Sequence, residues 1–190
     1  MEKLTKAIAF AAEKHEGQTR KGSDTPYIAH PLEALAIAAT VTNDQNVLMA
    51  AVLHDVVEDC GVSLDEIETL FGKRVRELVA ADSEDKREDK PAADTWKIRK
   101  QETLDLIAKM DADSMTIVLA DKLSNIRSLS RDYAVLGEAL WQRFNCKDPQ
   151  EHFWYYRSIA DLLAPTFSDT SAWKEYFTLV YKTFVEGKQV

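Results

Sequence analysis

Residues 45–59, QNVLMAAVLHDVVED, decide the fold class of this chain. An apolar run, VLMAAVL, leads directly into a histidine and three carboxylates within six residues. Asp44 is a typical N-cap, and the spacing predicts one helix that continues to Asp59. The apolar residues along one side of this helix are Val47, Leu48, Ala51 and Leu53. Burying charge without partners is costly, so the ionisable end of this core helix must meet other groups of the chain.

Nearly every other periodic segment is also predicted to be helical, with no strand ladder and no internal repeat. The predicted helices cover residues 4–15, 31–41, 63–72, 74–81, 95–110, 114–129, 150–165 and 172–187. Ser63 and Glu66 have the spacing of a capping box. Residues 137–149 are less regular, and residues 82–94 are a highly charged loop broken by Pro91. The sequence therefore predicts an all-α fold.

Length and composition indicate an ordinary globular protein. The 190 residues favour one domain, 1–190, in which 166–190 form a C-terminal helical extension. The net charge of -8 argues against a dedicated nucleic-acid binder, which usually carries a basic face. Two cysteines form no framework, so a reducing cytoplasm is expected. Neither a signal-peptide layout nor an apolar run of about 18 residues occurs, so no membrane association is expected.

The histidine and carboxylates at the end of the predicted 45–59 helix form two layers along the helix. His54 and Glu58 are four residues apart, as are Asp55 and Asp59, so each pair lies along one side of the predicted helix. His54 and Asp55 could chelate one cation, while Glu58 and Asp59 reach a water one turn further on. Divalent metals accept this mixture of imidazole and carboxylate ligands.

Two adjacent ligands do not make a metal site, and two more candidates lie at the edges of apolar runs. His30 ends the loop PYIAH, and Asp121 follows the run MTIVLA. Each is either an ordinary polar position or a buried ligand, and these residues alone leave both interpretations open. His15 and His152 have weaker contexts.

Three stretches carry a resemblance to a known family: HEGQTRKGSDTPYIAHP (15–31), AAVLHDVVEDCGVSLDEI (50–67) and VLADKLSNIRSL (118–129). They resemble the HD-domain hydrolases of the RelA/SpoT type, and more narrowly the stand-alone small alarmone hydrolases, a group that includes the metazoan Mesh1 proteins. The resemblance covers roughly residues 1 to 165, and none of it is synthetase. It implies an HD-domain bundle of roughly eight to ten helices.

The resemblance also implies the roles of the acidic and histidine side chains. The implied cofactor is Mn²⁺, held by His30, His54, Asp55 and Asp121. Glu58 and Asp59 are implied to position and activate the attacking water. This assignment is chemically reasonable, because a bound metal lowers the pKa of water and a nearby carboxylate can take its proton.

The implied substrate site uses residues from the loop and from later helices. Arg20 is implied to stack on the base and Lys21 to lie near phosphate, and Asn125 is implied to contact the sugar or base. Ser128 and Tyr156 match further pocket positions, although Tyr155 is an alternative to Tyr156. The acidic segment 82–94 stands where the family has a loop near the pyrophosphate end, and its charges would weaken binding unless they face away.

These features predict an enzyme that hydrolyses the 3′-pyrophosphate of ppGpp or pppGpp and releases pyrophosphate. The alternative substrates are ppApp, NADPH and 5′-nucleotides; a 5′-nucleotidase would release free phosphate. A non-catalytic nucleotide-binding regulator is disfavoured, because the full set of ligands and the Glu58–Asp59 pair are present. The expected partner is a small nucleotide, and a neighbouring alarmone synthetase is a further candidate.

Overall fold

The structure is a computed structural model that describes residues 2–82 and 91–185. Within these ranges the chain forms ten α-helices and one 3-10 helix, and no strand longer than an isolated bridge between Thr19 and Pro26. The prediction of an all-α helical fold is confirmed.

The chain divides into two compact units. The first comprises residues 1–83 and 110–124, and the second comprises residues 84–109 and 125–190. Helix α8 (Ala112–Leu136) contributes residues to both units. The prediction of one domain over 1–190 with an extension over 166–190 stays a prediction.

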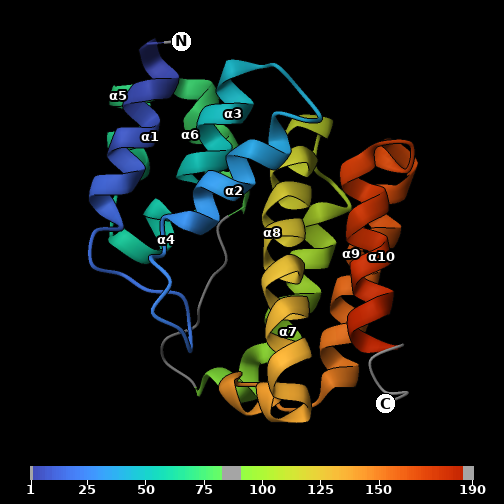
Figure 1. The fold of residues 1–190 in the computed structure, drawn as a ribbon. Helices are drawn as coiled ribbons and strands as arrows, with labels where there is room; N and C mark the ends of the chain where they lie inside the picture. Colours follow the sequence, from blue (N-terminus) through green and yellow to red (C-terminus); the bar gives the residue numbers. More distant parts are fainter. Residues whose placement is uncertain (1, 83–90, 186–190) are drawn as a thin grey trace. The chain divides into compact units, whose positions relative to one another are not determined.

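Helix α3 (Gln45–Leu53) is the centre of the first unit and packs against α1, α2 and α6 (Figure 1). Every residue from Val47 to Leu53 is buried, as expected for an unbroken apolar run that has neighbours on several sides. The surrounding helices are α1 (Glu2–Lys14), α2 (Ala29–Ala38), α4 (Val56–Cys60), α5 (Leu64–Phe71) and α6 (Lys73–Asp82).

The prediction of one helix from residue 45 to Asp59 is wrong. The helix ends at Leu53, and α4 begins at Val56 after a turn at His54 and Asp55. The Nδ1 atom of His54 lies 2.9 Å from the carbonyl oxygen of Ala51, which a continuous helix would pair with the N–H of Asp55. The metal-ligand candidate itself therefore takes the backbone acceptor, and the helix is interrupted at that point.

Caps fix where these helices begin and end. Asp44 accepts a hydrogen bond from the N–H of Asn46 at the start of α3, and Ser63 accepts one from Glu66 at the start of α5. Both predicted N-caps are confirmed. Gly61, with φ of 67°, ends α4 in the left-handed conformation that glycine adopts readily.

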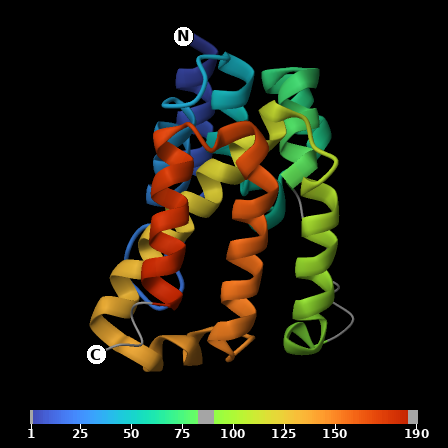
Figure 2. The ribbon, with the colours of Figure 1, turned by 90° about the vertical axis from the view of Figure 1, so that its right-hand side faces the viewer.

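In the second unit, α9 (Pro149–Phe167) packs against both α7 (Ala92–Ile107) and α10 (Ser171–Phe184), and Figure 2 shows it between them. Residues 137–149, predicted to be less regular, include a 3-10 helix, η1 (Gly137–Arg143). Buried His152 lies among the rings of three aromatic residues, Trp96, Trp141 and Phe144. Trp96, Trp141 and His152 are buried, so they belong to the core of the second unit.

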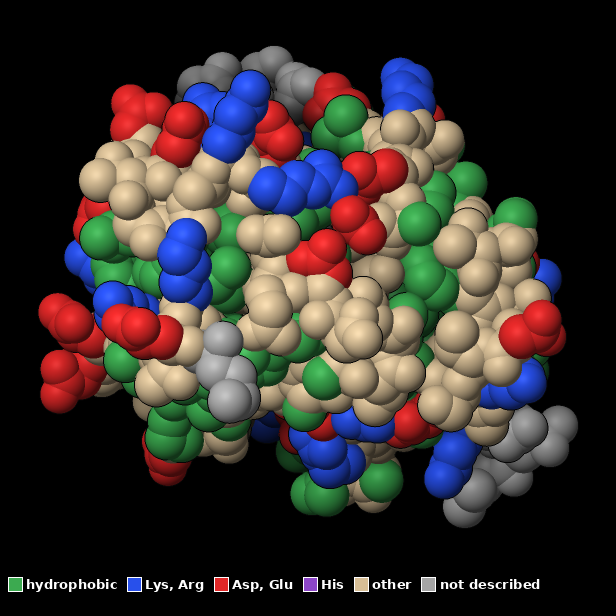
Figure 3. Space-filling model, turned by 90° about the horizontal axis from the view of Figure 1, so that it is seen from above, with side chains coloured by type: hydrophobic (Ala, Val, Ile, Leu, Met, Phe, Trp, Pro, Cys, Tyr) green, Lys and Arg blue, Asp and Glu red, His purple; other side chains and the backbone are tan. Residues whose placement is uncertain are grey.

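Basic and acidic side chains are interspersed on the face of the molecule shown in Figure 3, where no continuous basic area appears. The acidic loop predicted over 82–94 lies mostly outside the described residues, which resume at Pro91. Within the described ranges, none of the helices combines the length and the apolar character needed to cross a bilayer.

Candidate active site

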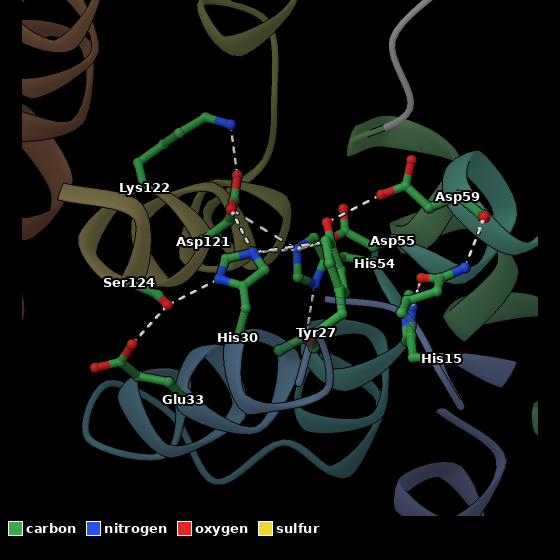
Figure 4. A network of polar contacts seen from close by, with 12 residues as sticks. His15, Tyr27, His30, Glu33, His54, Asp55, Asp59, Asp121, Lys122 and Ser124 are labelled. Carbon is green, nitrogen blue, oxygen red and sulfur yellow. Dashed lines mark hydrogen bonds and ion pairs between the residues drawn. The ribbon is translucent and has the colours of Figure 1, made fainter. Parts of the chain in front are cut away.

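Three buried side chains from distant parts of the sequence meet in the first unit (Figure 4). His30 comes from α2, His54 from the turn after α3, and Asp121 from α8. One possible ligand atom of each lies within 4.8 Å of the others. The two histidine Nε2 atoms are 3.2 Å apart, and Asp121 Oδ1 lies 3.1 Å from His30 Nε2.

Asp55 adds a second carboxylate to this group. Its Oδ2 atom lies 3.1 Å from His54 Nε2 and 3.5 Å from His30 Nε2. The Asp55 side chain is 18% exposed, whereas the side chains of His30, His54 and Asp121 are at most 6% exposed. The structure therefore brings the four predicted metal ligands together, with Asp55 the most accessible to solvent.

The ring nitrogens that face the cluster are proton acceptors in the neutral histidines. A carbonyl oxygen can only accept, so His54 Nδ1 donates to Ala51 and leaves Nε2 as the acceptor. His30 makes a 2.8 Å contact through Nδ1 to Ser124 Oγ and likewise turns Nε2 toward the carboxylates. Acceptors that face one another in a buried site require a positive charge between them.

The pKa shifts in the cluster reflect that requirement. Burial lowers the pKa of His30. Burial also acts against the charged form of His54, but the carboxylates of Asp55 and Asp121 outweigh it and raise the pKa of His54 well above its ordinary value. The pKa of Asp55 is lowered despite its burial, chiefly by His54, and that of Asp121 is lowered despite its burial, chiefly by Lys122. The Asp55 and Asp121 carboxylates thus favour a proton on His54 as the positive charge.

The donor set fits a divalent cation in place of that proton. Two protein ligands that are each about 2.1 Å from one ion lie about 3.0 to 3.5 Å apart at octahedral or tetrahedral angles. The contacts among the Nε2 and carboxylate oxygen atoms range from 3.1 to 3.7 Å. Mixed imidazole and carboxylate ligands suit several divalent metals, so the geometry indicates a divalent metal without selecting one.

Helix α4 carries the predicted catalytic pair, and both Glu58 and Asp59 are exposed. Tyr27 connects Asp59 of this pair to Asp55, one of the four predicted metal ligands. Its hydroxyl lies 2.8 Å from Asp55 Oδ2 and 2.9 Å from Asp59 Oδ2 (Figure 4). Sequence reasoning missed Tyr27, although it stands three residues before His30 in the quoted loop PYIAH, one turn from a candidate ligand.

Tyr27 is itself held in place by its neighbours. Its ring stacks on buried His15, with centroids 4.8 Å apart. His15 Nδ1 contacts the Gln18 side chain at 2.8 Å, and the Gln18 amide donates to the backbone oxygen of Asp59 at 3.2 Å. Burial and the nearby Asp55 and Asp59 charges raise the pKa of Tyr27, which keeps the phenol protonated as a donor. His15, which had a weak sequence context, supports this side of the site.

The predicted substrate residues divide between the two units. The guanidinium of Arg20 lies over the Tyr27 ring, 5.3 Å from its centroid, and Lys21 is exposed. Backbone hydrogen bonds from Arg20 to Thr25 and from Tyr27 to Gln18 close this loop. The remaining predicted substrate residues, Asn125, Ser128 and Tyr156, belong to the second unit. Their roles stay predictions.

Comparisons with known proteins identify the family. The HD-domain family model matches residues 7–147 of the chain. The chain belongs to the HD-domain family. It shares 40% identity over 131 residues with the Drosophila melanogaster MESH1 protein, named a guanosine-3′,5′-bis(diphosphate) 3′-pyrophosphohydrolase. That match covers 67% of this chain and 69% of the MESH1 protein.

A longer relative is the bifunctional (p)ppGpp synthase/hydrolase SpoT of Escherichia coli K12, 39% identical over 132 residues. This match covers 68% of the chain but 18% of SpoT. Among solved structures, a metazoan ortholog of SpoT, described as hydrolysing ppGpp with a role in starvation responses, has a TM-score of 0.74 and 28% identity. It covers 96% of this chain and 95% of its own, so the likeness extends well beyond residue 147.

Proposed function

We propose that this chain is a manganese-dependent hydrolase that removes the 3′-pyrophosphate of ppGpp or pppGpp. The products are pyrophosphate and GDP or GTP. The relatives named as guanosine-3′,5′-bis(diphosphate) 3′-pyrophosphohydrolases support this proposal, because each of the MESH1 matches extends over about two thirds of both chains. The convergence of two histidines and two carboxylates is the observation in this molecule that carries it.

In this proposal, His30, His54, Asp55 and Asp121 hold the manganese ion. The chemistry that such an ion supplies when bound is a lower pKa for a nearby water and neutralisation of phosphate charge. Glu58 and Asp59, exposed on α4, orient the attacking water and accept its proton. Tyr27 donates to Asp59 and fixes its carboxylate relative to Asp55.

The reaction consumes one water. Its oxygen bonds to the phosphorus that is esterified to the ribose 3′ oxygen, and the bond between that phosphorus and the 3′ oxygen breaks. The proton accepted from water passes to solvent or to the leaving oxygen, which departs as the free 3′ hydroxyl of GDP or GTP. We assign the nucleotide contacts to Arg20 and Lys21 in the loop before His30. Further contacts are assigned to Asn125, Ser128 and Tyr156.

The test is a substrate panel with the manganese-loaded protein: ppGpp, ppApp, NADPH and 5′-nucleotides, with the products resolved by anion exchange. We expect pyrophosphate and GDP from ppGpp. Asp121→Asn keeps the shape of the side chain and should abolish turnover, whereas Glu13→Gln, an exposed change on α1, should not alter it. Release of orthophosphate alone, or turnover confined to 5′-nucleotides, would contradict the proposal.

We further propose that the enzyme acts in the cytoplasm on free nucleotide. Neither Cys60 nor Cys146 forms a disulfide, which fits a reducing compartment. A neighbouring alarmone synthetase is the proposed source of its substrate. Deleting the gene beside an active synthetase should raise the cellular ppGpp level, and an unchanged level would contradict this role.

A further inference from the structure

From His30, a chain of polar side chains leads through Ser124 to Glu33, away from the other predicted metal ligands and on the side opposite Tyr27 (Figure 4). His30 Nδ1 lies 2.8 Å from Ser124 Oγ, and Ser124 Oγ lies 2.7 Å from Glu33 Oε2. His30 and Glu33 are one turn apart on α2, and Ser124 is one turn beyond Asp121 on α8. The three residues therefore connect the two helices that supply His30 and Asp121.

Counting protons assigns the direction of both hydrogen bonds. A carboxylate only accepts, so the single hydroxyl proton of Ser124 is donated to Glu33. With that proton used, Ser124 Oγ can meet His30 Nδ1 only as an acceptor, and Nδ1 must carry the hydrogen. His30 then has its lone pair on Nε2, the nitrogen 3.1 Å from Asp121 Oδ1.

The two histidines of the cluster are thus fixed in different ways. His54 Nδ1 is satisfied by the backbone oxygen of Ala51, which no substitution removes. Among the described residues, Ser124 is the hydrogen-bond partner of His30 Nδ1. Ser124 is 1% exposed and holds its acceptor orientation because Glu33 draws the proton away. Without Glu33, the hydroxyl could rotate and donate to Nδ1, and the ring proton would move to Nε2.

We propose that Ser124 and Glu33 are positioning residues that fix His30 in the Nδ1–H tautomer and so keep Nε2 available to the metal. This inference rests on the metal-dependent function proposed above. Partners that hydrogen-bond to a metal-ligating histidine set its tautomer and orientation, and losing one typically costs about 10- to 100-fold in metal affinity. We call the hydrogen bonds that run from His30 through Ser124 to Glu33 the relay. We expect a loss of metal affinity of that size when the relay is broken.

The first measurement concerns the tautomer and needs neither metal nor substrate. In nitrogen-15 NMR spectra of the metal-free protein, the His30 ring should show a protonated Nδ1. Ser124→Ala and Glu33→Ala should shift population toward protonated Nε2, while Ser124→Thr keeps the hydroxyl and the wild-type tautomer. An Nε2-protonated ring in the wild type, or an unchanged tautomer in both Ala variants, would overturn the proposal.

The second measurement is manganese affinity, followed by the signal of free Mn²⁺ in electron paramagnetic resonance. Ser124→Ala should weaken binding by about 10- to 100-fold, and Ser124→Thr should restore most of it. The matched controls are Ser130→Ala on α8 and Glu13→Gln on α1, which should bind like the wild type. Equal affinity in Ser124→Ala and Ser130→Ala would overturn the relay.

Failure of the relay and failure of the proposed function give different results. If the wild type binds manganese but releases no pyrophosphate from ppGpp, the substrate assignment fails, and the NMR and affinity comparisons still decide the relay. Thermal unfolding of each metal-free variant separates a local effect from a loss of folding. Should Ser124→Ala not fold, Glu33→Ala and Glu33→Gln test the same relay from the less buried end.

Discussion

A single proton at Tyr27 joins two parts of the active site. The phenol contacts Asp55 Oδ2 and Asp59 Oδ2 at nearly equal distances, but it can donate to only one at a time. A cation beside Asp55 would draw electron density from that carboxylate and favour donation to Asp59. Tyr27 can therefore make the orientation of Asp59, the proposed catalytic carboxylate, depend on whether the proposed metal site is filled.

Tyr27→Phe should lower kcat by about 10- to 100-fold, the usual cost of losing a partner of a ligand in a metal site. The ring and its stacking on His15 are kept, so the thermal unfolding temperature should change little. Tyr133→Phe is the matched control, because the Tyr133 hydroxyl donates to Glu138 in the second unit, whereas the four predicted metal ligands belong to the first. Equal kcat values for the two variants would exclude the role given to Tyr27.

The two carboxylate layers should separate by metal binding. Asp55→Ala should lose both manganese and turnover, because Asp55 Oδ2 lies against both histidines. Glu58→Ala should keep manganese and lose turnover, by about 10²- to 10⁴-fold if Glu58 acts in proton transfer. Calorimetric manganese titration combined with pyrophosphate release checks both. Loss of manganese in the Glu58 variant would make Glu58 a metal ligand.

The predicted metal ligands could be identified from the sequence more readily than the residues that hold them in place. His30, His54, Asp55 and Asp121 could be named because metal ligands need particular donor types, and the family resemblance supplied the pairing. Tyr27, Ser124 and Glu33 escaped, because hydroxyls and single carboxylates are common in loops and helices. Their meaning comes from distances across 28 to 94 positions of the chain, which no local pattern encodes.

At the level of helices, the turn between α3 and α4 separates a buried helix from a helix with exposed carboxylates. Helix α3 is fully buried from Val47 onward, whereas α4 presents Glu58 and Asp59 to solvent. A straight helix would keep both segments on one axis. The interruption at His54 and Asp55 lets the short helix take its own direction, and Gly61 then ends it after Cys60.

Gly61→Ala should lower the free energy of unfolding by about 1 to 2 kcal/mol, the cost of a left-handed conformation for a residue with a Cβ atom. No heavy atom lies within 4 Å of a Cβ placed at this position, so the cost is conformational and not steric crowding. Gly61→Asn should cost less, because asparagine tolerates this conformation better. Urea unfolding curves compare the three proteins, and equal stability of Ala and Gly would contradict the assignment.

Helix positions and caps were largely predictable, because apolar periodicity and the N-cap side chains of Asp44 and Ser63 are local signals. The end of α3 was not. Asp55 and its neighbours have helical sequence spacing, and the break depends on the His54 ring taking the Ala51 carbonyl. A side chain whose orientation is set by a tertiary site overrode the local pattern.

For the whole molecule, buried His152 makes stability depend on pH. His152, in the second unit, lies outside the group of coupled histidines and carboxylates. Its pKa is lowered by burial from the ordinary value of 6.5, so the unfolded chain takes up the proton first as the pH falls. This contribution to stability is complete above about pH 6.5 and declines below it, by at most about 1.4 kcal/mol per pH unit.

His152→Gln keeps a donor for the carbonyl of Cys146 and removes the titrating group. Between pH 7.5 and pH 5.5 the wild type should therefore lose more stability than this variant. Urea unfolding of the metal-free proteins at both values gives the difference. Parallel losses in the two proteins would show that His152 does not contribute.

The family and the all-α class followed from the sequence alone, whereas the division into two compact units did not. Helix α8 hides that boundary, because its apolar pattern runs without a break from the first unit into the second. The first unit ends at Ser124, in the middle of α8, and the composition of the chain does not change there.

The origin of Asp121 in α8 has a consequence for how the protein is made. Sixty-six positions separate Asp55 from Asp121. At about 5 to 20 residues per second, synthesis of that stretch takes roughly 3 to 13 seconds. Ribosome-bound chains with Asp121 fully emerged should retain manganese more strongly than chains arrested before it, and equal retention would argue against this order. With the proposed ligand set, the last ligand to leave the ribosome thus decides when a nascent chain can first acquire a metal ion.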